Sequence, residues 1–108
     1  MKGFDFMFLV LNKDKVVKIN RINKIKGLMF KKDIINEGYI FYNCGSIHTF
    51  FMKQDIDVMV LDKDNRIVKI KSNLKKNKIL LSKGITTLEL PLNTCKYFKL
   101  NDKVKLID

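Results

Sequence analysis

Residues 46–62 read SIHTFFMKQDIDVMVLD, and within them lies Ile56–Leu61, a run of apolar residues broken only by Asp57. A short apolar run rich in β-branched residues predicts a strand that is buried on both faces. The side chains of Thr49–Met52 predict a second strand just before it. We therefore expect these two strands to lie at the centre of a sheet, where their aromatic and aliphatic side chains fill the interior.

The rest of the chain predicts more short strands, separated by polar turns. Phe6–Leu11 and Val16–Asn20 flank the turn Asn12–Lys15, whose Asn and Asp side chains favour a β-hairpin. A turn of similar composition, Asp62–Asn65, precedes the predicted strand 66–71. Further strands are predicted at 39–42, at 86–90 just before the only proline, and at 103–107.

Helical spacing occurs in only two segments. Ile22, Ile25, Leu28 and Met29 fall on one face of a short amphipathic helix over residues 20–30, and residues 92–98 predict a helical turn. The predicted fold is therefore mainly β, or β-rich α+β: a small closed or partly closed β-barrel of about seven short strands with one or two short helices. All 108 residues are expected to form a single domain, because a chain of this length supports one hydrophobic core.

The chain is strongly basic, with 22 Lys and Arg against 11 Asp and Glu and a net charge of +11. Such a charge favours an anionic partner such as nucleic acid. Only Arg21 and Arg66 are arginines, however, and proteins more often use the guanidinium group to recognise phosphates and bases. Lysine-driven nucleic-acid binding therefore stays an alternative beside a solvated edge strand protected by lysines. The lysines concerned are Lys69, Lys71, Lys75, Lys76 and Lys78.

The N-terminal apolar run Phe4–Leu11 is too short for a membrane span and lacks the cleavage site of a signal peptide. We therefore expect a cytoplasmic protein with no membrane span, in which Cys44 and Cys95 stay reduced. With His48 these cysteines offer three metal ligands or a thiol nucleophile. Their spacing matches neither a structural zinc site nor a catalytic motif, so we predict no metal and no cofactor.

A pattern of short motifs begins at Arg21 and covers nearly the whole chain. Its motifs are, in order, Gly27–Phe30, Glu37-Gly38 with Phe41, Phe50–Lys53, Ile56-Asp57, Leu61-Asp62 and Leu88–Pro91. Together they resemble the domain-of-unknown-function 192 family, also called uncharacterised protein family 0127. The resemblance implies a compact, mainly β fold and brings no established activity. Where many relatives have Trp or glycines, this chain has Phe51, Asn93 and Asn101. Asn suits such glycine positions because it tolerates the left-handed backbone region.

Asp57 is the first candidate for a site residue, because a carboxylate in an apolar strand must be paired, hydrogen-bonded or turned to a cleft. It serves either as a ligand-binding acid or general base, or as a structural acid bonded to backbone N–H groups or to Arg21. We predict that Arg21 and Asp57 lie near each other.

The leading functional prediction is a small noncatalytic domain that binds a small ligand or a protein partner. The predicted ligand-binding residues are Arg21, His48, Met52 and Asp57. The alternative is a small hydrolase-type enzyme that uses Asp57 or Glu37 with His48 for acid–base chemistry. The aromatic residues around Met52 suit a stacking platform or, more simply, the core of a small barrel.

Overall fold

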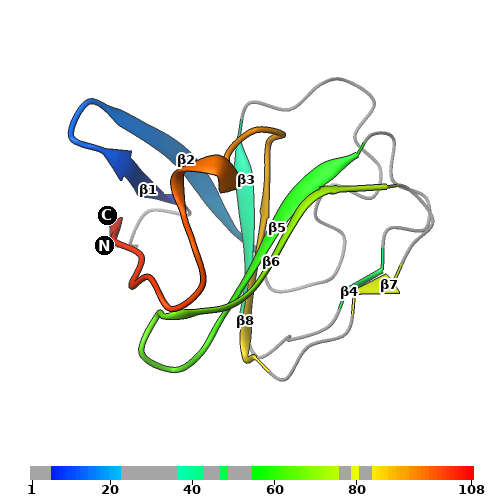
Figure 1. Cartoon of the computed structure of the whole chain (residues 1–108). Helices are drawn as coiled ribbons and strands as arrows, with labels where there is room; N and C mark the ends of the chain where they lie inside the picture. Colours follow the sequence, from blue (N-terminus) through cyan, green and yellow to red (C-terminus); the bar gives the residue numbers. More distant parts are fainter. Residues whose placement is uncertain (1–5, 23–36, 43–46, 49–54, 76–78, 81–83) are drawn as a thin grey trace.

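The structure, a computed structural model, describes residues 6–22, 37–42, 47–48, 55–75, 79–80 and 84–108. Nine strands and one short 3₁₀ helix lie within these ranges (Figure 1). They are β1 (Phe6–Asn12), β2 (Lys15–Ile22), β3 (Gly38–Tyr42), β4 (Ile47–His48), β5 (Ile56–Leu61), β6 (Ile67–Leu74), β7 (Ile79–Leu80), β8 (Thr86–Leu90), η1 (Cys95–Tyr97) and β9 (Leu106–Ile107).

Seven strands form one curled sheet in the order β6-β5-β8-β3-β2-β1-β9. Only β2 and β3 pair in parallel, and every other pair of neighbours in this sheet is antiparallel. The C-terminal segment connects the two edges of the sheet, because Lys103 bridges to Arg66 beside β6 and Leu106 then pairs with Leu9 of β1. The result is the predicted mainly β fold, with a partly closed barrel.

The two predicted hairpin turns share their chemistry. In the β1–β2 turn, Asn12 Oδ1 accepts a hydrogen bond of 2.8 Å from the backbone N–H of Asp14. In the β5–β6 turn, Asp62 Oδ1 accepts bonds from the N–H groups of Asp64 at 2.8 Å and Arg66 at 3.0 Å. The bonds from Arg66 and Asp64 lower the pKa of Asp62. Each side chain thus holds its own turn closed, as short polar side chains do.

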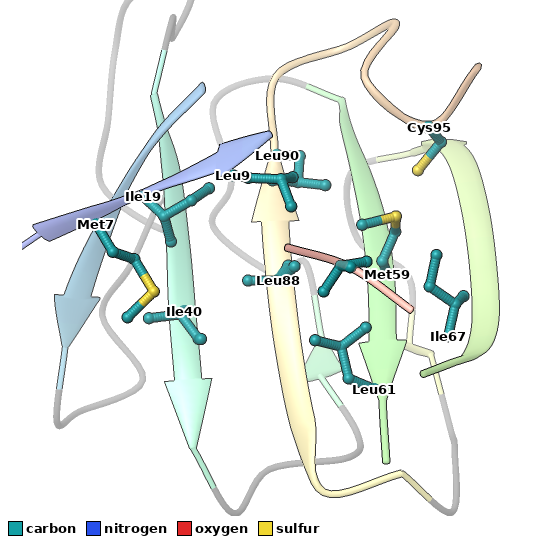
Figure 2. Packing of buried hydrophobic residues seen from close by; sticks show 11 residues of the cluster. Met7, Leu9, Ile19, Ile40, Met59, Leu61, Ile67, Leu88, Leu90 and Cys95 are labelled. Carbon is teal, nitrogen blue, oxygen red and sulfur yellow. The ribbon is translucent and has the colours of Figure 1, made fainter. Parts of the chain in front are cut away.

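The hydrophobic core lies on the concave face of the sheet (Figure 2). Alternate residues of each strand contribute to it, as the two-residue period of a strand requires. It comprises Met7, Leu9, Ile19, Ile40, Met59, Leu61, Ile67, Leu88, Leu90, Cys95 and Val104. Every residue of β5 is buried, so the prediction that this strand is covered on both faces is confirmed. Every residue of β8 is buried in the same way.

Several predicted elements differ from the observed ones or lie outside the described residues. The helical turn predicted at 92–98 is confirmed as η1, which spans Cys95–Tyr97. The last strand is shorter than predicted and covers only Leu106–Ile107. Strands β4 and β7 form a separate two-stranded sheet that the sequence did not predict. Most of the predicted helix at 20–30 and the predicted strand 49–52 fall outside the described residues; at the start of that helix, residues 20–22 instead continue β2.

The asparagines that stand where relatives have glycine do adopt a left-handed backbone. Asn93 has φ 72° and Asn101 has φ 74°, so the conformational reason given for tolerating them is confirmed. Asn65 and Asn73 also have positive φ, at 62° and 57°. The high asparagine content of this chain therefore meets a backbone requirement at four described positions.

Candidate functional site

Asp57 lies on the core face of β5 and is only 2% exposed. Its Oδ1 accepts a hydrogen bond of 2.9 Å from the backbone N–H of Asn73, and its Oδ2 accepts one of 2.9 Å from the N–H of Cys95. One carboxylate thus joins three segments: β5, β6 and the start of η1. The prediction of a structural acid bonded to backbone N–H groups is confirmed.

A bulge in β6 creates this arrangement. Ile56 pairs with Leu74 and Val58 pairs with Lys71, so two residues of β6 lie opposite the single residue Asp57. The second of these is Asn73, whose φ of 57° allows its N–H to reach the carboxylate. The apolar neighbours of Asp57 place it inside the barrel, and the bulge supplies the donor that its burial requires.

Arg21 does not pair with Asp57, so that prediction is wrong. In the sheet, β3 and β8 lie between β2, which carries Arg21, and β5. Arg21 instead donates a hydrogen bond of 3.1 Å from Nη1 to the carbonyl of Phe6 and forms an ion pair with Asp108. The hydrogen bond with Asp108 raises the pKa of Arg21. Sequence separation concealed this partner, because only the folded sheet brings the C-terminal residue Asp108 to the side chain of Arg21.

The other predicted site residues are scattered. His48 is the second residue of β4, where its backbone pairs with Ile79 of β7 in the small sheet. Met52 lies outside the described residues. Glu37 accepts a hydrogen bond of 2.9 Å from Asn20 Nδ2. Ligand binding by His48 and Met52 stays a prediction, and the hydrolase alternative finds Asp57 already occupied by two backbone donors.

A row of polar side chains crosses the sheet on the face opposite the core. Asn20 of β2 is in register with Tyr39 of β3, and Tyr39 is in register with Glu89 of β8. Residues in register share a face of the sheet. Ile40 follows Tyr39, and Leu88 precedes Glu89; both belong to the core. Because side chains alternate along a strand, Tyr39 and Glu89 lie on the opposite face. We call Asn20, Tyr39 and Glu89 the outer polar row.

The outer polar row combines a buried acid with half-buried polar groups. Glu89 is 4% exposed, although it is an acid near the centre of the sheet. At the other end of the row, Asn20 Nδ2 also bonds to the carbonyl of Gly38 at 3.1 Å, and Glu37 Oε2 lies 4.0 Å from Lys18 Nζ. The row therefore presents carboxylates at both ends, with an amide and a phenol between them.

Within the described residues, no three His, Cys, Asp or Glu side chains gather closely enough to hold a metal ion. No helix in the same part of the chain has the length and apolar character needed to span a membrane. Lys69 and Lys71 are exposed on β6, which lies at one edge of the sheet. Exposed lysines at this position are consistent with a solvated edge strand protected by lysines.

Comparison with protein families gives one match, which covers most of the chain. The profile of DUF192, described as an uncharacterized ACR, matches residues 13–106. The chain belongs to the DUF192 family. No curated protein sequence matches this DUF192 protein at a significant level.

Two solved structures share the fold of this DUF192 protein. A protein of unknown function from Novosphingobium aromaticivorans aligns with a TM-score of 0.72 and 19% identity, over 93% of this chain and 83% of that one. A protein from Sinorhizobium meliloti, described as a "putative transcription regulator", aligns with a TM-score of 0.75 and 17% identity, over 94% of this chain and 92% of that one. At these identities the similarity establishes the fold alone.

Glu89 is the polar residue of this DUF192 protein that sequence reasoning missed. It lies in the motif Leu88–Pro91, where alternation of Leu and Glu suggests a carboxylate that points to solvent. The observed burial arises because both faces of β8 are covered. The only signal in the sequence was the neighbouring strand β5, whose continuous apolar character already predicted a sheet covered on both faces.

Cys95 of this DUF192 protein is buried, and its Sγ lies 3.6 Å from the carbonyl oxygen of Val58. Burial, together with the charge of Asp57, raises the pKa of Cys95 to about 12. The thiol is therefore protonated at neutral pH and is a poor nucleophile or metal ligand. The folded pKa exceeds that of an ordinary thiol, so raising the pH from about 9 towards about 12 favours the unfolded state.

We expect Cys95 to resist alkylation in the folded protein. In a Cys44→Ser variant, where Cys95 is the only thiol, iodoacetamide at about pH 8 should react at least ~100-fold more slowly with native than with urea-unfolded protein, because the native thiolate fraction is so small. Mass spectrometry of quenched samples measures both rates. Comparable rates in the two states would contradict the assigned burial and pKa.

Proposed function

We propose that this protein is a small noncatalytic domain that binds a ligand across the outer polar row. The observation that carries the proposal is the position of Glu89, a buried carboxylate on the sheet face opposite the core, in register with Tyr39 and then Asn20. A carboxylate, a phenol and an amide on three adjacent strands offer a ligand both charge and hydrogen bonds.

The chemistry of the row indicates the class of ligand. Glu37 and Glu89 are carboxylates near its two ends, and adjacent strands lie about 4.8 Å apart, so the row spans roughly 10 Å across β2, β3 and β8. A linear molecule with an amine at each end matches this spacing, since ammonium groups form charge-assisted hydrogen bonds with carboxylates. Tyr39 and Asn20 would orient the chain between them.

The state of Asp57 supports a noncatalytic role. A general base needs a lone pair directed at a substrate proton. Both oxygens of Asp57 instead accept backbone N–H groups inside the barrel. Asp57, on which the hydrolase alternative mainly depends, therefore has a structural role. This role favours binding over hydrolysis.

An NMR titration with spermidine tests the proposal. We expect backbone amide shifts confined to residues 18–22, 37–41 and 87–90, with saturation, and at least a tenfold loss of affinity in Glu89→Gln, since each amine–carboxylate contact contributes about 1.5–3 kcal/mol. Asp14→Asn makes the same chemical change in the exposed β1–β2 turn and should leave the affinity unaltered.

Tyr39→Phe provides a second test in case Glu89→Gln fails to fold. It keeps the ring and removes one hydroxyl, so a several-fold loss of affinity is expected if Tyr39 contacts the ligand. Shifts spread over the whole surface, or equal binding by wild type and by all folded variants, would overturn the proposal.

A further inference from the structure

A second polar surface lies at the other side of the barrel, where the β1–β2 turn meets the C-terminal segment. The two are joined by a hydrogen bond of 3.1 Å from Lys15 Nζ to the hydroxyl of Tyr97, although 82 positions separate them in the chain. Six exposed lysines occur in these two segments, against three acids, Asp14, Asp102 and Asp108, the last of which forms an ion pair with Arg21. The lysines are Lys13, Lys15, Lys96, Lys99, Lys103 and Lys105.

The side chains of two of these lysines lie over the ring of Tyr97. The Nζ atom of Lys15 lies 5.7 Å from the centre of the Tyr97 ring, and that of Lys96 lies 5.5 Å from the same centre. The negative face of the ring attracts both ammonium groups. An anion placed beside the ring would interact favourably with both ammonium groups. The hydrogen bond from Lys15, together with the charges of Lys15 and Lys96, lowers the pKa of Tyr97.

One of the acids in these segments makes a local hydrogen bond to the backbone. Asp102 Oδ2 already accepts a hydrogen bond of 3.0 Å from the backbone N–H of Lys99. Lys75, which follows β6, forms an ion pair of 3.2 Å with Asp55. The lysines around Tyr97 thus form a cationic surface with an aromatic ring at its centre.

We propose that the surface formed by Tyr97, Lys15, Lys96 and the adjoining lysines binds single-stranded nucleic acid. Single strands are bound by a cationic surface that follows the phosphates together with aromatic rings on which bases stack. Tyr97 is half-buried, so part of its ring is open to a base while the lysines take the phosphates. The arrangement does not involve the outer polar row, and the inference stands independently of the function proposed there.

Fluorescence anisotropy with a labelled oligothymidine of about 20 nucleotides tests this inference on the whole chain. Wild type should bind with an affinity that falls steeply between about 50 and 200 mM salt. Lys15→Gln/Lys96→Gln should weaken binding at least tenfold at the lower salt and reduce the salt slope by about 1.4, since each lost phosphate contact on a single strand contributes ~0.7. Tyr97→Leu should weaken binding at least about fivefold, whereas Tyr97→Phe should bind like wild type.

Lys69→Gln/Lys71→Gln is the matched control, because it removes the same charge from exposed positions of β6. It should lower the affinity by no more than about twofold. An equal loss in both double variants would show that only net charge matters and would overturn the inference. So would tight binding to vesicles rich in phosphatidylserine without binding to the oligonucleotide, since that result would assign the surface to membranes.

Discussion

Asp57→Ala will lower the free energy of unfolding by about 3–4 kcal/mol. The substitution removes the acceptor for the N–H groups of Asn73 and Cys95, each 2.9 Å from a carboxylate oxygen. Hydrogen bonds to a charged group contribute about 1.5–3 kcal/mol each, and donors left buried without an acceptor add a desolvation cost. The loss should also release the bulge of β6 and the start of η1, because Asp57 is what joins them to β5. Urea denaturation followed by circular dichroism measures the change.

Asp57→Asn separates charge from shape. Asparagine keeps one acceptor oxygen but directs an NH₂ group at the second backbone donor, so it should also destabilise the protein strongly. Asp14→Asn, in the exposed β1–β2 turn, is the control for the loss of a carboxylate and should change stability by less than about 0.5 kcal/mol. A loss of less than about 1 kcal/mol in Asp57→Ala would show that Asp57 is not a structural clamp.

Gly38→Ala will cost about 2–3 kcal/mol, the second largest effect that we expect. A Cβ atom at Gly38 would lie 2.6 Å from Ile19 Cδ1, 2.9 Å from Leu90 Cδ2 and 2.9 Å from the carbonyl oxygen of Glu89. The two side-chain methyl groups can rotate away, but the carbonyl belongs to the backbone of β8. Relief of that contact requires β3 and β8 to separate, and the same urea experiment measures the cost.

Ile19→Val provides the control for Gly38→Ala, because valine lacks the Cδ1 atom that the new methyl group would meet. The double variant should recover part of the loss, so that the two substitutions are not additive. What remains should reflect the contact with the Glu89 carbonyl. Full additivity, or a Gly38→Ala variant as stable as wild type, would show that β3 and β8 are less closely packed than the structure indicates.

Local sequence features predicted the parts of this fold that depend on local physics. The turn residues Asn12 and Asp62 close hairpins in the predicted places, because their side chains bond to the backbone only two to four residues away. The apolar run Ile56–Leu61 predicted a strand and its burial on both faces, although this strand lies second from the edge of the sheet and not at its centre. Asn93 and Asn101 occupy left-handed positions, as their replacement of family glycines suggested.

The pairing of polar groups could not be predicted in the same way, because it depends on contacts between distant segments. Arg21 and Asp57 were matched on charge alone, yet two strands intervene, and Asp108 and Phe6 are the partners that the sheet brings to Arg21. The short strands β4 and β7 likewise have two residues each, too few to carry a periodic signal.

The sequence by itself determined that this is a small, basic, mainly β protein with an acid embedded in a buried strand, since composition, turn residues and apolar runs act locally. Only the tertiary structure decided what that acid does. A bulge in β6 and the start of η1 direct two backbone N–H groups at Asp57 and make it structural, whereas the strand order sets Glu89 beside Tyr39 on the opposite face. The register of strands far apart in the chain thus selected which carboxylate bonds to backbone N–H groups inside the barrel and which lies on the opposite face of the sheet.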